Sequence, residues 1–254
     1  MGYERRTTAM RTEIFCSILL PLTLAATLQY SEARSEVVKD PDFTGIWMPL
    51  INRGQPGRLI RWPREVPYTE QGQALWDAYT GEFDPVTDDP ARFCVHPGMP
   101  RSMLGTPTFP IEIFHRQQDL TMMLEAYYQY RKIYIEGYDY PEPILSTRIG
   151  YSVAHWDDDT LVVATSQLAE RDKGRILMSA NARITERIHM EIDDDGQKLL
   201  IDNITFTDPA IYREPIAMRG VWYYSPDTPI MEYICSQNLY DEHIAAKRAA
   251  AAKD

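Results

Sequence analysis

Short segments that alternate apolar with polar residues recur along the second half of the chain, and turn-forming residues separate them in pairs. The paired segments are residues 149–156 with 160–165, 182–192 with 199–207, and 217–224 with 230–235. A period of two places successive side chains on opposite faces of a β-strand. Acidic or proline-containing turns lie between the partners at residues 157–159, 193–196 and 225–227. The pattern therefore predicts three successive hairpins.

Four further strand-like segments come earlier, at residues 43–48, 111–114, 120–126 and 128–135. Strands do not alternate with helices and no repeat recurs, so a parallel α/β fold is excluded. Antiparallel sheets avoid exposed edges by closing into a barrel or by stacking. We predict a mainly β fold, an antiparallel meander closing into a lipocalin- or calycin-like barrel, with a sandwich as the alternative.

Two helices and one long loop accompany the predicted strands. Thr69 to Tyr79 has helical spacing and a capping residue, whereas residues 81–110 form a long Pro-rich loop of a kind that is often functional. The predicted single domain, residues 34–254, comprises a strand, helix and loop in 42–110, the meander in 111–238 and a C-terminal helix in 239–254.

The first 33 residues have the pattern of a signal peptide. Three arginines, at positions 5, 6 and 11, precede an apolar run at 14–28, and Ser31-Glu32-Ala33 offers small residues for cleavage. We therefore expect export to the periplasm or secretion, a mature chain that begins near Arg34, and no stable membrane insertion after cleavage. An N-terminal membrane anchor is the alternative interpretation.

The net charge and the cysteines limit the classes of binding partner and the cellular compartment that we expect for this chain. The net charge of −11 excludes nucleic acid as a partner, because phosphate binding needs a basic face. Two cysteines, Cys94 and Cys235, remain after cleavage and favour a disulfide in an exported chain, with two separate buried thiols as the alternative. The oligomeric state cannot be predicted from these features.

A series of spaced motifs runs from residue 42 to residue 238. It includes Phe-x-Gly-x-Trp at 43–47, Cys-x-x-x-Gly-x-Pro at 94–100, Arg-x-Ile-Tyr-x-x-Gly at 131–137, Trp-x-x-Asp-Thr-Leu-Val-Val-x-Thr at 156–165 and Glu-Tyr-x-Cys at 232–235. The series resembles that of a family of exported bacterial proteins, and this resemblance implies export and a β fold but no reaction. Gly45-Ile46-Trp47 also resembles the Gly-x-Trp of lipocalin-type barrels, in which the Trp closes one end.

Three candidate site residues lie on the neighbouring predicted strands 120–126 and 128–135. Glu125 and Arg131 flank a tight connection and can form a charge-assisted pair, either as a structural ion pair or, with Tyr134 as a donor, as an anchor for a carboxylate or enolate. His115 and His155 are candidate general bases, because histidine titrates near neutrality.

The remaining candidates are predicted to bind ligand. They are Glu125, Tyr128, Tyr130, Trp156, Glu186 and Arg187. Glu186 and Arg187 must point to opposite faces of their strand, and the inward one needs a partner such as Arg131 or Glu125. No metal site or cofactor is predicted, because no ligand spacing or catalytic motif is present.

Three functions are compatible with these features. The first is a periplasmic barrel that binds a small apolar or aromatic molecule. The second is a cofactor-independent lyase, isomerase or hydrolase that uses His115 or His155 with Arg131 and Tyr134. The third is a structural envelope protein without a ligand.

Overall fold

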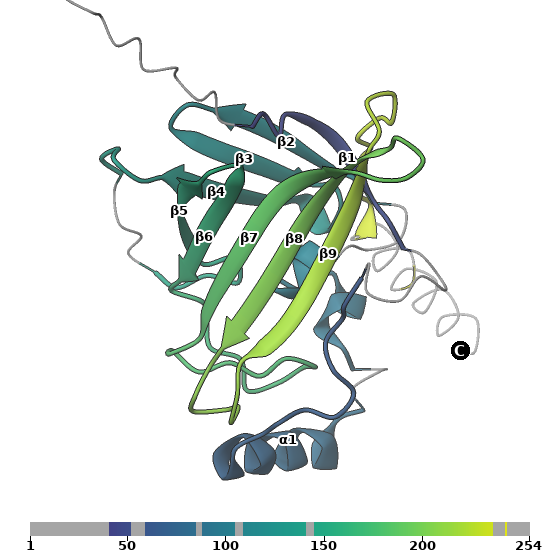
Figure 1. Cartoon of the computed structure of the whole chain (residues 1–254). Helices are drawn as coiled ribbons and strands as arrows, with labels where there is room; N and C mark the ends of the chain where they lie inside the picture. The colour runs from purple at the N-terminus through teal and green to yellow at the C-terminus, as the bar shows by residue number, and fades with distance from the viewer. Residues whose placement is uncertain are drawn as a thin grey trace, which may run out of the picture. The chain divides into compact units, whose positions relative to one another are not determined.

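A computed structural model describes residues 41–51, 59–84, 88–104, 109–140, 145–235 and 242, all within the compact unit Lys39–Asp254. These residues form a closed barrel of nine strands (Figure 1). The predicted signal peptide at 1–33 lies outside the described residues, as does the predicted C-terminal helix at 239–254 apart from Glu242. The mainly β barrel is therefore confirmed.

The strands follow one another around the barrel in chain order. They are β1 (Gly45–Pro49), β2 (Ile111–Arg116), β3 (Asp119–Leu124), β4 (Gln129–Ile135), β5 (Tyr151–Asp157), β6 (Thr160–Ser166), β7 (Arg183–Ile192), β8 (Lys198–Thr207) and β9 (Ile216–Tyr224). The helices are α1 (Glu70–Glu82) and the short η1 (Pro90–Phe93), η2 (Arg101–Leu104) and η3 (Ala126–Tyr128).

One pair of strands departs from the predicted antiparallel meander. Strands β4 and β5 are parallel, whereas the other neighbouring pairs are antiparallel, including β1 with β9. A closed ring of nine strands cannot alternate direction throughout, because alternation needs an even number. The parallel pair satisfies this constraint, and β4 therefore ends at the opposite end of the barrel from that at which β5 begins.

The predicted third hairpin is wrong in its second half. Residues 231–234 are not a strand, although β9 forms as predicted. Strand β9 pairs with β8 on one side and with β1 on the other, where Trp47 lies opposite Tyr224. No edge of β9 is therefore left for a further strand. Barrel closure therefore overrides the local strand pattern.

The alternating strand directions give the barrel two different ends. We call one the turn end, where the short connections at residues 117–118, 157–159 and 193–197 lie. We call the other the loop end, which carries the connections at 125–128, 167–182 and 208–215. The long loop reaches the loop end as well, because Met99 donates its backbone N–H to the carbonyl of Arg148, 2.9 Å away.

Helix α1 lies at the loop end (Figure 1). Its predicted cap is confirmed, since the Thr69 side chain accepts a hydrogen bond from the Gly72 N–H at 3.0 Å. The helix packs closely on the β8–β9 connection: a Cβ added at Gly72 would lie 2.1 Å from the carbonyl oxygen of Ile211. Glycine therefore allows the close approach of the helix to the barrel.

The barrel interior is packed with side chains. Trp47, Phe206 and Trp222 are among the largest that are fully buried. The indole N–H of Trp47 donates to the carbonyl of Phe43 at 2.9 Å, which fixes the Trp of the lipocalin-like motif near the turn end. Among the described residues, no helix is both long and apolar enough to cross a membrane.

The predicted disulfide is confirmed. Cys94 and Cys235 are bonded, with their Cα atoms 5.7 Å apart and a sequence separation of 141. The bond joins the long loop to the segment that follows β9. That segment also contacts the loop end through Tyr233, whose ring lies 4.9 Å from the ring of Tyr127.

Candidate functional site

A polar cluster interrupts the apolar interior of the barrel. Arg131 donates from Nη1 to Glu186 at 2.7 Å, and from Nη2 to Ser152 at 3.2 Å and Thr165 at 3.1 Å. Arg131, Glu186 and the neighbouring Asp202 are completely shielded from solvent. The cluster therefore joins five consecutive strands, β4 to β8, through buried side chains.

Asp202 has an unusual charge state within this cluster. Burial raises the pKa of its carboxyl well above 3.8, and the negative charge of Glu186 raises it further, against the opposing effect of Arg131. Neither Asp202 oxygen has a hydrogen-bond donor among the described residues. A proton on Asp202 would supply the missing donor, toward Glu186, which also raises the pKa. The charges of Arg131 and Glu186 thus offset each other, and a proton on Asp202 would leave the cluster without an excess charge.

The expected Glu125–Arg131 pair is wrong. Glu125 lies beyond the end of β3 and accepts a hydrogen bond from the backbone N–H of Met231 at 2.6 Å. Arg131 lies further along β4, opposite Met122, and points into the interior. The alternative prediction that an inward Glu186 contacts Arg131 is confirmed, and Arg187 points outward to Asp157 at 2.8 Å.

The structure does not bring the four candidate catalytic residues together. Arg131 is inside the barrel, whereas Tyr134 lies on the outer face of β4, with its ring 4.2 Å from the ring of Tyr140. His155 is on the outer surface, and its Nδ1 lies 3.9 Å from Oε1 of Glu136. His115 lies near the turn end, where its ring is 5.8 Å from that of Trp156.

The predicted ligand-binding residues are also dispersed. Tyr130 is 64% exposed on the barrel exterior. Tyr128 packs edge-on against Tyr233 at 6.1 Å near the loop end. Trp156 contacts Phe43 at the turn end, with ring centroids 5.5 Å apart. These side chains therefore line no common cavity.

Two cavities lie at the loop end instead. The larger has a volume of about 780 Å³, within the range of about 300–1,000 Å³ that is typical of small-molecule sites. Its lining residues are Arg61, Trp62, Pro63, Arg64, Val66, Tyr68, Gln73, Trp76, Arg101, Leu104, Arg175 and Ile176. We call this larger cavity the loop-end cavity. It combines aromatic rings with guanidinium groups.

Backbone contacts fix one wall of the loop-end cavity. Ile60 exchanges two hydrogen bonds with Arg219 on β9, at 3.0 and 2.9 Å. The Arg213 N–H donates to the carbonyl of Pro67 at 2.8 Å. The segment that carries Arg61, Trp62 and Arg64 is thus attached to the barrel on both sides.

The aromatic side chains of the wall form a continuous group. Tyr68 stacks on both Trp76 and Tyr212, with centroids 5.9 and 5.5 Å apart, and Trp62 meets Tyr212 edge-on at 5.6 Å. Burial raises the pKa of Tyr68 to about 12, so its hydroxyl stays protonated at neutral pH. The Tyr68 hydroxyl and the Trp62 indole N–H have no hydrogen-bond partner among the described residues.

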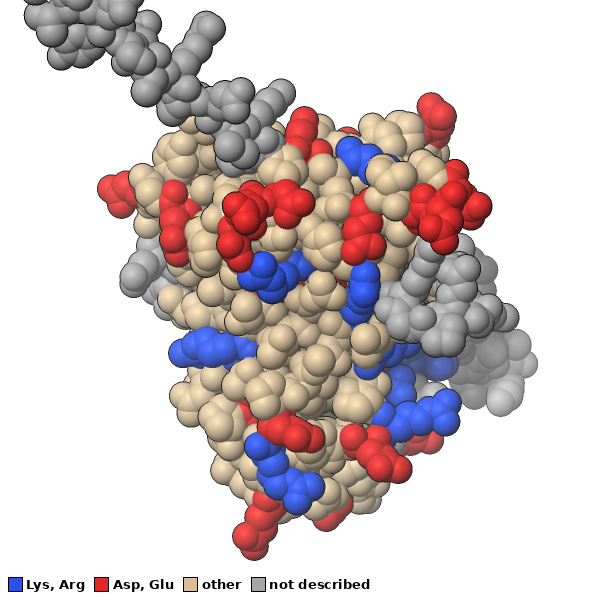
Figure 2. Space-filling view, in the orientation of Figure 1, with Lys and Arg blue, Asp and Glu red and all other residues tan. Residues whose placement is uncertain are grey.

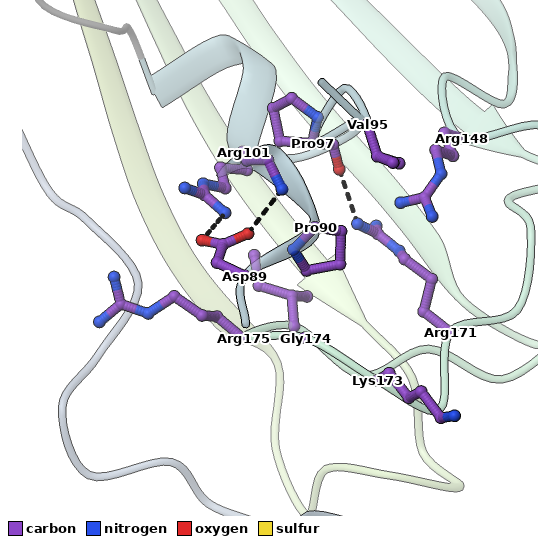
Figure 3. Close-up of a pocket in the computed structure, with 12 residues that line it drawn as sticks. Asp89, Pro90, Val95, Pro97, Arg101, Arg148, Arg171, Lys173, Gly174 and Arg175 are labelled. Carbon is purple, nitrogen blue, oxygen red and sulfur yellow. Dashed lines mark hydrogen bonds and ion pairs between the residues drawn. The ribbon is translucent and has the colours of Figure 1, made fainter. Parts of the chain in front are cut away.

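A second, smaller cavity of about 30 Å³ shares Arg101, Arg175 and Ile176 with the loop-end cavity. On one side, Arg101 pairs with Asp89 at 2.7 Å. On the other, Arg171 donates to the carbonyl of Pro97 at 2.7 Å, and Arg148 lies beside it (Figure 3). This volume holds only one or two water molecules, so the loop-end cavity is the candidate binding site.

The charges of the chain are unevenly distributed. In Figure 2 most acidic side chains on the visible face gather toward the turn end, and basic side chains form a band below them. The acidic turns at 157–159 and 193–195 account for part of the acidic group. The loop-end cavity is locally basic although the chain carries a net charge of −11.

Sequence reasoning missed the loop-end cavity. The segment Arg61-Trp62-Pro63-Arg64 is not among the candidate site residues predicted from the sequence, although two arginines around Trp-Pro offer a signal in an acidic chain. The long Pro-rich loop was expected to be functional, and it does provide Arg101 to this cavity.

The fold and the site define a class: a closed barrel, similar to lipocalin-type barrels, with a ligand-sized cavity at one end. Among the residues that the structure describes, no group of three His, Cys, Asp or Glu side chains is placed to hold a metal ion. Comparison with protein-family models finds no matching family, and comparison with curated proteins finds no matching relative.

Proposed function

We propose that the chain is an exported, periplasmic or secreted protein that binds a small aromatic or apolar molecule in the loop-end cavity. The observation that carries this proposal is the group of Trp62, Tyr68 and Trp76 in a cavity of about 780 Å³. Aromatic side chains offer large apolar faces and a polar edge, a combination that suits aromatic ligands.

Two observations support export. The first is the charged and apolar N-terminal pattern of residues 1–33, which is typical of a signal peptide. The second is the Cys94–Cys235 disulfide, because such bonds persist in oxidising compartments.

Titration calorimetry with 2-naphthol, a neutral aromatic probe, tests the binding function. We expect saturable binding to the parent protein. Trp76→Ala removes a ring from the wall of the cavity and should weaken binding about two- to tenfold, which corresponds to an aromatic contact of about 0.5–1.5 kcal/mol.

Trp156→Ala is the matched control, because Trp156 has the same side chain but lies at the turn end against Phe43. It should leave the affinity for 2-naphthol unchanged. If Trp156→Ala weakens binding and Trp76→Ala does not, the ligand binds at the turn end near Trp156, a residue that the sequence predicts to bind ligand. Absence of any binding to the parent would reject the proposal.

The geometry gives less support to a cofactor-independent enzyme. Such a lyase, isomerase or hydrolase would need its base, its acid and its anion anchor on one surface. His115, His155, Tyr134 and Arg131 instead occupy the turn end, the barrel exterior and the interior.

A further inference from the structure

The described lining of the loop-end cavity is basic. It contains Arg61, Arg64, Arg101 and Arg175 but no Asp or Glu. Arg101 has a carboxylate partner in Asp89, at 2.7 Å. The other three guanidinium groups have no ion-pair partner within the described part of the chain. Such an arrangement contrasts with the chain as a whole, in which Asp and Glu outnumber Lys and Arg by 37 to 26.

The smaller cavity next to it increases the local positive charge. Arg148, Arg171 and Lys173 line it together with Arg101 and Arg175, and Asp89 is the single acidic residue of its described lining. Burial lowers the pKa of Arg171 to about 10, and the positive charge of Arg148 contributes to the decrease. Like charges that are this close repel one another, and a bound anion would relieve that repulsion.

We propose that the ligand of the loop-end cavity is an aromatic carboxylate, whose ring stacks near Trp62, Tyr68 and Trp76 and whose acid group pairs with the arginines. This inference rests on the proposed binding function and names its ligand class. The planar guanidinium presents two parallel N–H donors that match the two oxygens of a carboxylate.

The size of the loop-end cavity limits the ligand to a small molecule, and the positive charge of the described cavity lining favours an anionic ligand. Basic residues around a cleft raise the local concentration of anions and accelerate their association. Because Arg61, Arg64 and Arg175 are exposed, added salt should screen this attraction strongly. Both effects are measurable with a pair of ligands that share one ring system, one anionic and one neutral.

The test compares 2-naphthoate with 2-naphthol, which share one ring system, by titration calorimetry at low and at high salt. We expect the parent protein to bind 2-naphthoate at least about tenfold more tightly than 2-naphthol at low salt. The preference should shrink as salt is added. Arg64→Gln and Arg175→Gln should each reduce the affinity for 2-naphthoate several-fold, and by a larger factor than the affinity for 2-naphthol, so that the preference for the anion shrinks.

Arg187→Gln is the control, because Arg187 is also an exposed arginine but pairs with Asp157 at the turn end, outside both cavities. It should not alter either affinity. Arg64→Lys keeps the charge without the two-pronged geometry and should show an intermediate loss.

The outcomes separate the inference from the proposed function. If both probes bind equally, the ligand is not selected for its charge and the inference is wrong, while the binding function stands. If neither probe binds, the binding function fails and the inference fails with it. If the preference persists in Arg64→Gln and Arg175→Gln, these arginines do not recognise the acid group and the inference is overturned.

Discussion

Three ionisable side chains in the barrel interior set the protonation of one carboxyl. Arg131 and Glu186 neutralise each other through a direct hydrogen-bonded contact, whereas Asp202 is fully buried next to Glu186. A buried carboxyl without a partner of its own is stable only in the neutral form. Asp202 therefore keeps its proton at pH values at which exposed carboxylates have lost theirs.

This protonation predicts how stability depends on pH. The pKa of Asp202 in the folded state lies above its unfolded value of about 3.8. Between these two values the folded state binds more protons than the unfolded state, so stability falls as pH rises through that window. Asp202→Asn supplies a permanent donor toward Glu186 and removes this loss. The variant should therefore gain stability over the parent progressively as pH is raised.

Urea unfolding of parent and variant at about pH 5, 6.5 and 8 measures the effect. Asp194→Asn, which removes the same group from the exposed β7–β8 turn, is the control. A stability difference between Asp202→Asn and the parent that stays constant across this range would contradict the protonated state of Asp202.

At the scale of the elements, the position of α1 depends on a single glycine. A Cβ at Gly72 would lie 2.1 Å from the Ile211 carbonyl oxygen, whereas one at Gly81 on the same helix would meet nothing within 4 Å. Gly72→Ala must displace the helix from the β8–β9 connection and should lower the free energy of unfolding by about 1–3 kcal/mol. Gly81→Ala should raise it by about 0.5–1 kcal/mol, because alanine favours the helix.

Chemical denaturation of the two variants tests this expectation. Trp76 lies one turn after Gly72 and lines the loop-end cavity, so Gly72→Ala should also weaken 2-naphthol binding. Equal stability of the two alanine variants would show that the connection moves freely with the helix and that their contact is not tight.

Most strands could be predicted from local signals, because a period of two and turn residues specify each hairpin within about twenty residues. The parallel β4–β5 pair could not, since it follows from closing a ring of nine strands. Because barrel closure pairs both edges of β9, residues 230–235 have no strand edge with which to pair. Both corrections depend on the number of strands in the whole sheet rather than on any segment.

At the scale of the whole molecule, the candidate site combines segments that are distant in sequence. Arg64, Trp76, Arg101 and Arg175 come from four different parts of the chain and meet only when the loops converge on one end of the barrel. The strand period predicts that one of Glu186 and Arg187 points inward and needs a partner such as Arg131 or Glu125, because it places neighbouring residues on opposite faces. The structure shows that the inward residue is Glu186 and that its partner is Arg131. No such period constrains the loops, so the cavity that they build was not predictable.

The Cys94–Cys235 disulfide connects two distant parts of the described chain covalently. It joins two cysteines at a sequence separation of 141, and the chain between them contains eight of the nine strands, from β2 to β9. In the chain-entropy model, such a connection stabilises mainly by restricting the unfolded chain, and removal of a native disulfide typically costs about 2–5 kcal/mol. The double variant Cys94→Ser/Cys235→Ser should lose stability by about this amount in urea unfolding and keep the β-sheet signal in circular dichroism. Dithiothreitol should lower the parent to the level of the variant and leave the variant unchanged. If the variant is as stable as the parent, or if reduction destabilises both equally, the bond does not contribute in this way.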